Sequence, residues 1–433
     1  MDNGFKKLLR TSLVLGLALC FCLGLSTTAL AGGKVFKIGS LCDLTGPFSA
    51  GTAPFLEGQR AYQRYVNEDL GGINGVKVEL VAADCQMKLD KEIAAYKKFR
   101  DVDKVLMFFN LNSAGTAAIA PMAKRDGIPH MYLDEPKAVF LKGGWYFGIV
   151  PIWGETGAAC FDWWLENVWN KKETRKPRVG LLTADYQGGY TIAIYIREFL
   201  RQKNIPIVLD MYTPLQTADA MTYVQALRKA KVDIVINGNT ASTGVVVYKT
   251  IHALGLKMAK LSSIPTPLAS SGLRKAMGES GVGILAASPF ALWDQTDVPA
   301  IKLIHDLYAK WYPGKNKMAE LGVMVGWTEM SVACEALRRA MKKVGYEALT
   351  KDIKKGRKIL KETLENDMRG FDGKGLFAPI TYTPTDHKCN ARVKITRLAP
   401  DTKIEILTGW VSPPPLKPEQ RDSKWWDEQL KKK

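Results

Sequence analysis

Short apolar runs alternate with amphipathic stretches along the first part of the chain. Four such runs occupy residues 35–41, 76–84, 104–110 and 128–134. The residues between them repeat their apolar positions with a period of about 3.6, which is typical of helices. Repeated strand–helix units with short, buried strands predict a largely parallel sheet that is covered by helices on both faces. We therefore predict an α/β lobe with a doubly wound sheet.

The same alternation restarts after Val150. Residues 145–155, between the two series, form an extended apolar run that contains a proline and lacks a helical period. We interpret this run as the junction between two doubly wound lobes with mostly parallel sheets. The strands of the second lobe are predicted at residues 178–185, 205–212, 232–238, 260–265 and 283–290.

The pattern changes again after residue 290. Residues 298–365 are mainly helical by their period, whereas residues 377–407 are rich in β-forming residues but lack the parallel-sheet rhythm. The proline-rich residues 411–420 and the basic end of the chain are predicted to form a mobile tail.

The N-terminus has the organisation of a secretory signal peptide. Three basic residues, an apolar run at residues 12–25 and small residues at 29–31 follow one another in the required order. The length of the apolar run leaves an uncleaved anchor as an alternative. Lipid attachment at Cys20 is disfavoured because the bulky Leu19 precedes it. We predict cleavage near Ala31 and a periplasmic mature protein.

Length and charge constrain the class of protein further. A chain of 433 residues is longer than a single core usually serves, which also favours two lobes. The formal net charge is +18, of which the first 31 residues carry +2 and the remainder +16. Such a charge suits nucleic acid, anionic membranes or anionic ligands. Export argues against nucleic acid as a partner, and the spread of the lysines favours a solvated basic surface.

Five cysteines remain after the predicted cleavage. None of them has CxxC spacing, so neither a zinc site nor a thioredoxin-like motif is indicated. Cys42 closes the first predicted strand and Cys85 the second, and parallel strands end at the same edge of a sheet. We therefore predict a Cys42–Cys85 disulfide in an oxidising compartment. Cys160 is expected to be buried, and the pairing of Cys160, Cys334 and Cys389 stays open.

Catalytic signatures are missing from the sequence. It contains no GxSxG, HExxH, GxxxxGK[ST] or GxGxxG motif, which argues against an enzyme and against a bound cofactor or metal. The histidines are isolated from one another, which favours structural roles; they are His130, His252, His305 and His387.

Residues 110–121, NLNSAGTAAIAP, place small and hydroxyl residues where a buried strand passes into a helix. Ligands of open α/β sheets bind beyond the carboxyl ends of the strands, and a helix N-terminus offers unpaired N–H groups to an anion. Ser113 and Thr116 would add hydroxyl donors, while Ala114 and Gly115 would let a ligand approach the backbone. Ser113 could also be the N-cap of this helix, and the two roles are compatible.

Residues 34–134 resemble the N-terminal lobe of the leucine/isoleucine/valine-binding family of periplasmic solute-binding proteins, which feed ABC importers. The resemblance rests on IGSLCDLTGPFSAGT, GGINGVKVELVAADCQ and NSAGTAAIAPMAKRDGIPHMY. It continues more weakly through VGLLTADYQGGY and IHALGLK, to about residue 410. It implies a type I periplasmic binding protein, in which two lobes joined by three crossovers close on a small ligand.

The resemblance also implies domain boundaries. The crossovers are expected near residues 149–151, 288–291 and 370–375. The N-terminal lobe would comprise residues 32–149 and 291–370, and the C-terminal lobe residues 150–290 and 371–410. A signal peptide at 1–31 and a Pro/Lys-rich tail at 411–433 complete the chain.

The ligand contacts of the family match this chain only in part. The family serine that holds the ligand carboxylate corresponds to Ser113, and its second-lobe aromatic corresponds to Tyr186. The next first-lobe loop has Asp134 and Pro136 where the amino-acid binders have small and hydroxyl residues. The family acid that pairs with the ligand ammonium would fall near residues 264–267, which contain no Asp or Glu.

Two questions about these residues stay open. Asp134 and Glu135 either contact ligand or cap the following helix. The aromatic residues at the lobe junctions either line the pocket or pack the hinge; they are Trp153, Tyr186, Phe290 and Trp293. The complete predicted ligand-binding set is Ser113, Ala114, Thr116, Asp134, Pro136, Tyr186, Asn239 and Trp293.

The sequence therefore predicts an exported solute-binding receptor of a branched-chain amino acid type ABC import system. Its partners would be a membrane permease and a small organic ligand: an amino acid, an aromatic or hydrophobic carboxylate, or an amide. The alternatives are a periplasmic sensor that acts through a signalling partner and an exported enzyme.

Overall fold

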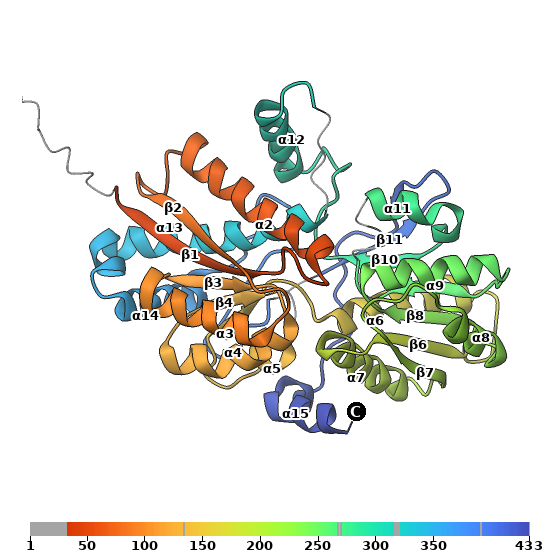
Figure 1. The fold of residues 1–433 in the computed structure, drawn as a ribbon. Helices are drawn as coiled ribbons and strands as arrows, with labels where there is room; N and C mark the ends of the chain where they lie inside the picture. The colour runs from red at the N-terminus through yellow and green to blue at the C-terminus, as the bar shows by residue number, and fades with distance from the viewer. Residues whose placement is uncertain are drawn as a thin grey trace, which may run out of the picture. The chain divides into compact units, whose positions relative to one another are not determined.

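The computed structural model describes residues 33–132, 135–265, 268, 271–315, 321–389 and 392–432. From Phe36 onward the chain forms one compact unit. Two β-sheets, each with helices on both faces, make up its framework (Figure 1). The predicted α/β class with mostly parallel sheets is confirmed. No helix among the described residues combines the length and hydropathy needed to cross a membrane.

The first sheet has the strand order β2-β1-β3-β4-β5. Where the register is recorded, at β1–β3, β3–β4 and β4–β5, the neighbours pair in parallel. The strands are β1 (Val35–Cys42), β2 (Lys77–Asp84), β3 (Met107–Asn110), β4 (His130–Tyr132) and β5 (Tyr146–Gly148).

Alternating side chains bury the two faces of this sheet against different helices. Phe109 belongs to the core that includes Leu56 of α2 (Ser49–Arg64), whereas Phe108 belongs to the core that includes Tyr96 and Ile119. These last two residues lie on α3 (Leu89–Lys98) and α4 (Ser113–Asp126). π-helical turns, Tyr65–Asp69 and Phe99–Asp103, extend α2 and α3, and the short α5 (Pro136–Val139) follows β4.

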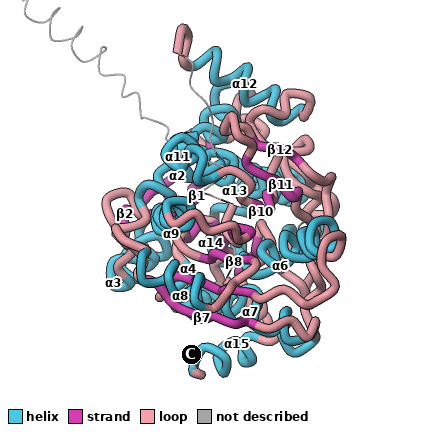
Figure 2. The backbone as a smooth tube through the Cα atoms, turned by 90° about the vertical axis from the view of Figure 1, so that its right-hand side faces the viewer, coloured by secondary structure: helices cyan, strands magenta, loops and turns pink. Residues whose placement is uncertain are grey.

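The second sheet repeats this arrangement and then adds two strands. Its order is β12-β11-β10-β9-β8-β6-β7. The labelled strands β12, β11, β10, β8 and β7 follow one another in that order in Figure 2. The pairs from β10 to β7 are parallel, whereas β11 and β12 join antiparallel at the other edge. The strands are β6 (Val179–Ala184), β7 (Ile207–Thr213), β8 (Ile234–Gly238), β9 (Ala259–Ser262), β10 (Leu285–Ser288), β11 (Lys394–Leu398) and β12 (Ile404–Ile406).

Helices also cover both faces of the second sheet. Leu181 and Ile236 share a core with Phe161 of α6 (Trp153–Trp164) and Ile192 of α7 (Gln187–Gln202). Leu182 instead shares a core with side chains of α8 (Met221–Lys229) and α9 (Ala241–Ala253). The shorter elements are a π-helical turn at Leu165–Trp169, α11 (Ser271–Met277) and a 3-10 turn at Gly278–Gly281.

After the second sheet the chain returns to the first. It passes through α12 (Pro299–Trp311) to α13 (Leu321–Thr350), which packs along α2 and bends at Gly345. Two glycines allow the backbones of α2 and α13 to approach closely. A Cβ on Gly326 would lie 1.8 Å from the Phe55 carbonyl oxygen, and one on Gly58 would lie 2.1 Å from that of Val323. Alanine at either position would therefore force the helices apart.

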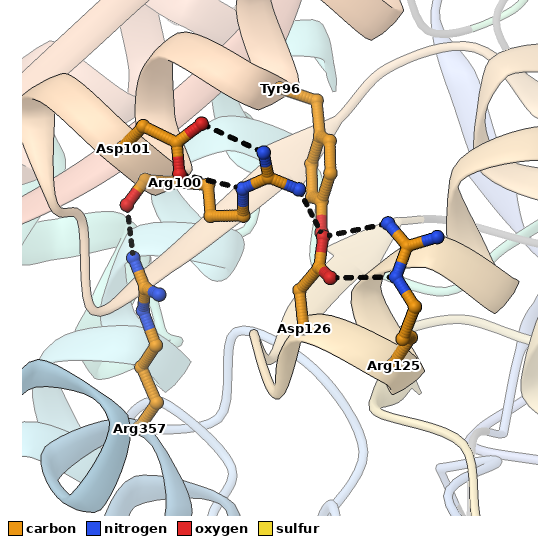
Figure 3. Close-up of polar contacts among 6 residues, drawn as sticks. All are labelled: Tyr96, Arg100, Asp101, Arg125, Asp126 and Arg357. Atoms are coloured by element: carbon orange, nitrogen blue, oxygen red, sulfur yellow. Dashed lines mark hydrogen bonds and ion pairs between the residues drawn. The ribbon is translucent and has the colours of Figure 1, made fainter.

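A polar network ties the next helix, α14 (Ile353–Asp367), to the first sheet's helices (Figure 3). Arg357 is buried and donates from Nη2 to the Arg100 carbonyl oxygen at 3.3 Å. Arg100 in turn binds Asp126 at 2.7 Å, and the Tyr96 hydroxyl donates to the same carboxylate at 2.8 Å. Burial would raise the pKa of Asp126, but hydrogen bonds from Arg125, Arg100 and Tyr96 outweigh it and lower that pKa.

The C-terminal segment differs from the predicted mobile tail. A 3-10 turn (Pro418–Arg421) leads into α15 (Ser423–Lys431), which lies beside α5 and α7 (Figure 1). Trp426 is fully buried, and its Nε1 donates to the Gln420 carbonyl oxygen at 2.8 Å. The prediction of a mobile tail was wrong. The proline content drew attention away from a short amphipathic helix, which the buried Trp426 fixes to the rest of the protein.

Candidate functional site

The loop after β1 is held in place by two aspartates. Asp43 accepts hydrogen bonds from the backbone N–H groups of Gly46 at 2.6 Å and Phe48 at 2.7 Å. Asp84, at the end of β2, accepts one from the N–H of Leu44 at 2.9 Å. These bonds fix the LTGP turn beyond the carboxyl end of the first sheet and place the Phe48 ring at the edge of the candidate site.

Helix α4 starts at the carboxyl end of β3, and Asn112 is its N-cap. The Asn112 Oδ1 atom accepts from the Ala114 N–H at 3.1 Å, and the Asn112 N–H is itself bound to Asn110 Oδ1 at 3.2 Å. The suggestion that Ser113 is the N-cap was therefore wrong, since Ser113 is the first helical residue. Its backbone N–H is left for a partner outside the helix.

That partner is a tyrosine from the second sheet's side of the molecule. The Ser113 N–H donates to the Tyr186 hydroxyl at 3.2 Å, and this hydroxyl donates to Asn112 Oδ1 at 3.4 Å. Tyr186 precedes α7, and its ring lies 5.5 Å from the ring of Phe48. A Cβ on Gly188 would come within 3.4 Å of Ser113 Oγ, so the starts of α4 and α7 approach each other here.

The next loop contributes a buried acid. Glu135 is the N-cap of α5, and its Oε1 atom accepts from the Lys137 N–H at 3.2 Å. Burial raises the pKa of Glu135 to about 8, although the Lys137 N–H counteracts the shift. Of the two roles considered for this residue, helix capping is the one present in the structure. Asp134 lies outside the described residues.

The other predicted residues of this loop and of α4 are placed as follows. Ala114 is exposed, but its N–H is occupied by the Asn112 cap. Thr116 is fully buried, and its hydroxyl has no hydrogen-bond partner within the described part of the chain. Pro136 is buried as the first residue of α5. Ser113 and Tyr186 are therefore the only two of the predicted set that a described hydrogen bond joins.

Asn239 and Trp293 are engaged elsewhere. The Asn239 N–H donates to Asn237 Oδ1 at 3.1 Å, and its Oδ1 accepts from the Thr213 hydroxyl, whereas the N-cap of α9 is the next residue, Thr240. The Trp293 ring stacks on His305 of α12 with 3.7 Å between ring centroids. Among the described contacts, neither residue touches Ser113 or Tyr186.

Gly115 makes room for the side chain of Glu92, which is not among the predicted site residues. A Cβ at this position would lie 1.4 Å from Glu92 Oε2, so the glycine accommodates a carboxyl group rather than a ligand. Glu92 is buried on α3 and accepts a hydrogen bond from Asn112 Nδ2. Its spacing of four residues from the buried Tyr96 is the sequence signal that could have revealed an inward-facing acid.

A small pocket lies beside Glu92, at the carboxyl ends of β1, β2 and β3. Its lining combines acidic, amide, thiol and apolar side chains and contains no basic side chain among the described residues. The lining residues are Leu41, Cys42, Asp43, Cys85, Met87, Glu92, Asn110, Leu111 and Asn112.

Cys42 and Cys85 meet in this pocket as free thiols. The Cys85 N–H donates to the Cys42 carbonyl oxygen at 2.7 Å. Both sulfur atoms approach the Ala83 carbonyl oxygen, at 3.3 Å and 3.6 Å. Burial raises the pKa of each thiol to about 12, so neither is a reactive thiolate at neutral pH.

A family model described as periplasmic binding protein matches residues 35–403. The chain belongs to the periplasmic binding protein family. This periplasmic binding protein is also similar to Leu/Ile/Val-binding protein homolog 7 of Brucella suis biovar 1, with 22% identity over 245 residues. The match covers 54% of this chain and 61% of the relative, so the chain spans about three-fifths of the length of that relative.

Solved structures confirm the expected fold. A branched chain amino acid ABC transporter protein from Thermus thermophilus with bound valine has a TM-score of 0.74 and 20% identity, covering 88% of this chain and 97% of that one. A solute binding protein of an ABC transporter from R. palustris, in complex with 4-hydroxybenzoate, has a TM-score of 0.70 and 16% identity. It covers 88% of this chain and 98% of that one. At these identities the likeness establishes the fold alone.

The Ser113–Tyr186 contact offers hydrogen-bonding groups. A helix N-terminus and a phenol can hold an oxygen-rich or anionic group by hydrogen bonds. No cluster of His, Cys, Asp and Glu able to hold a metal ion occurs within the described ranges. The histidines stay apart from this contact: His130 stacks on Phe108 at 5.0 Å, and His387 binds Glu365 at 2.8 Å.

Proposed function

We propose that this periplasmic binding protein is the exported solute receptor of an ABC importer. It would bind one small organic ligand between two lobes and deliver it, chemically unchanged, to a membrane permease. The observation that carries the proposal is the hydrogen bond from the Ser113 N–H to the Tyr186 hydroxyl at 3.2 Å. It brings together the carboxyl ends of parallel strands from both sheets, which is where ligands of open α/β sheets bind.

The proposed lobes follow the two sheets. Residues 32–149 and 291–370 would form the N-terminal lobe, and residues 150–290 and 371–410 the C-terminal lobe. Residues 1–31, which lie outside the described residues, are proposed to be a cleaved signal peptide that directs the protein to the periplasm.

In the proposed mechanism, Tyr186 stands in for the ligand. Its hydroxyl oxygen accepts the hydrogen bond that a carboxylate oxygen of the ligand would accept from Ser113. Ligand entry would move Tyr186 from the start of α4 and close the lobes around the bound molecule. The Phe48 and Tyr186 rings, 5.5 Å apart, would then pack against its apolar part.

The proposed ligand is a carboxylate with a hydrophobic or aromatic body. Helix N-termini favour an anion, and the two rings favour an apolar group. The second-lobe acid that would pair with an amino-acid ammonium has no counterpart at residues 264–267. Valine and 4-hydroxybenzoate, which occupy the two related structures, are therefore suitable first probes, and the aromatic acid is the better match.

Ser113→Ala tests the site. We expect it to weaken ligand binding by about 1–3 kcal/mol, because a buried charged acceptor would lose a hydroxyl donor. A thermal-shift screen of carboxylates, amino acids and amides on the mature protein identifies the ligand through its stabilising effect, and calorimetry then compares the variants. Ser242→Ala, an exposed serine in the first turn of α9, is the matched control. Equal affinities of the Ser113 variant and the control would refute a role for the Ser113 hydroxyl in ligand binding.

We also propose that Cys42 and Cys85 form a disulfide after export. Oxidation would remove one proton and one electron from each thiol, and an exported thiol oxidant would accept them. Neighbouring strands lie about 4.8 Å apart, within the Cα separation that a disulfide permits. Intact mass measured with and without reductant on protein purified from the periplasm should show the loss of two hydrogens. The Cys42→Ser variant should show no such change, and two persistent free thiols in the wild type would contradict the pairing.

A further inference from the structure

Glu92 is buried beneath the first turn of α4, although it belongs to α3. Its Oε1 atom accepts a hydrogen bond from Asn112 Nδ2, and its Oε2 atom lies 3.5 Å from Asn110 Nδ2. Space for the carboxyl group depends on Gly115, where a Cβ would lie 1.4 Å from Oε2. An acid is therefore built into the floor of the helix start that is proposed to receive the ligand.

Asn112 connects this acid to the candidate site. Its Nδ2 group faces Glu92, and its Oδ1 atom accepts from the Ala114 N–H at 3.1 Å and from the Tyr186 hydroxyl at 3.4 Å. A side-chain amide has one donor end and one acceptor end, so an acceptor at Glu92 fixes which end points to Tyr186. If the amide turned over, it would present a donor to the Ala114 N–H and leave the cap unmade.

We propose that Glu92 is a positioning residue: it fixes the Asn112 amide so that the amide caps α4 and receives Tyr186, and it thereby couples α3 to the contact that closes over the ligand. The positioning of Asn112 by Glu92 rests on the hydrogen bonds alone. The coupling of α3 to closure over the ligand rests also on the proposed function. Glu92 itself does not touch Tyr186 in any described contact.

The charge of Glu92 would also influence an anionic ligand. Burial raises the pKa of this carboxyl to about 7, the Asn112 and Asn110 amides oppose the shift, and Asp43 adds to it. The titratable groups that face it are Asp43, Cys42 and Cys85, and the pocket lining has no cation to neutralise it. The neutral form should therefore favour an anion at Ser113, and affinity for such a ligand should fall as pH rises through 7.

A ligand-free double-mutant cycle tests the positioning role. Urea unfolding would compare Tyr186→Phe in the wild type with Tyr186→Phe in Glu92→Leu, which lacks the acceptor for Asn112. We expect the shift in urea midpoint caused by Tyr186→Phe to fall to less than half in the Glu92→Leu background, because Asn112 is then no longer held toward Tyr186. Glu92→Gln, which keeps an acceptor oxygen, should restore the full shift. Asp90→Leu, at an exposed site on α3, is the control.

Binding measurements supply the second readout, with 4-hydroxybenzoate and valine as probes at pH 6 and pH 8.5. Wild-type affinity for a bound probe should fall by up to roughly tenfold at the higher pH, a difference of about 1.4 kcal/mol, and Glu92→Gln should flatten the profile. Additive effects of the two substitutions on the urea midpoint would overturn the inference. A pH dependence of affinity in Glu92→Gln as steep as that of the wild type would also overturn the inference. This binding result decides whether Glu92 acts on the site if Glu92→Leu does not fold. If no compound of the carboxylate panel binds the wild type, the proposed function fails, and the ligand-free cycle still decides whether Glu92 positions Asn112.

Discussion

Lys388→Met is expected to lower the free energy of unfolding by about 3–5 kcal/mol, because it leaves the buried carboxylate of Glu155 without its partner. Lys388 Nζ lies 3.1 Å from Glu155 Oε1, and the side chains are 13% and 3% exposed. The other oxygen of Glu155 accepts the Ile152 N–H at 2.8 Å, which keeps the carboxylate from turning to solvent. Burial alone would lower the pKa of Lys388, but the Glu155 carboxylate outweighs it and raises that pKa. Urea unfolding at neutral pH measures the loss.

The position of this pair gives the loss a functional meaning. Ile152 follows the segment that leaves β5 for α6, and Lys388 lies in a segment that also contacts β5, since the Gly148 N–H donates to the His387 carbonyl oxygen at 3.0 Å. The pair therefore fastens the start of α6, beside the first proposed crossover at residues 149–151, to the segment that contains Lys388. Breaking it should loosen the end of that crossover on the side of the C-terminal lobe.

Two further variants separate this effect from a general loss of charge. Lys302→Met removes a lysine paired with Asp306 on the exposed face of α12, where the side chains are 68% and 62% exposed, and should cost less than about 1 kcal/mol. Adding Glu155→Gln to Lys388→Met should recover part of the loss, because no unpaired charge remains buried. If Lys388→Met lowers the free energy of unfolding no more than Lys302→Met does, the buried Lys388–Glu155 pair does not stabilise the fold more than a surface ion pair.

The fold could be predicted because its strands are apolar and regularly spaced. Strands such as β1 and β6 are almost wholly buried in parallel sheets, and this gives continuous hydrophobic runs. β5 was missed, since three residues, Tyr146–Gly148, are too few to show a period. They were interpreted as part of the extended junction, whereas they form the edge strand of the first sheet.

Within the candidate site, only positions that follow from the direction of the strands could be predicted. Ser113 was placed correctly at a helix start because parallel strands end at one edge, and it contacts Tyr186, the other residue to which the resemblance assigns a ligand contact. The roles of Asn112 and Glu92 depend on which side chain of α3 points under α4. That direction is set by tertiary packing and by the missing side chain of Gly115, and local sequence does not encode it.

Trp426→Ala is expected to release the C-terminal segment, with a loss of about 3–5 kcal/mol in the stability of its docked state. The indole is fully buried and bonded to the Gln420 carbonyl oxygen. The segment also makes ion pairs from Lys137 to Asp427 at 2.5 Å, Lys417 to Glu198 at 3.2 Å and Arg421 to Asp386 at 3.0 Å, and the Tyr195 hydroxyl donates to the Pro414 carbonyl oxygen at 3.0 Å. The three ion pairs are partly exposed and contribute little without the tryptophan, because surface ion pairs are weak.

Limited proteolysis and hydrogen exchange of the full chain measure this release. In Trp426→Ala, residues 411–432 should be cleaved and exchange rapidly, and exchange should also increase in α5 and α7, on which α15 packs. The neighbouring Trp425 is only half-buried, so Trp425→Ala should cause a much smaller change and serves as the matched control. Because α5 starts at Glu135, release should also expose this acid to water and bring its pKa back toward the ordinary range for glutamate. Equal protection of the segment in both tryptophan variants would mean that Trp426 does not anchor it.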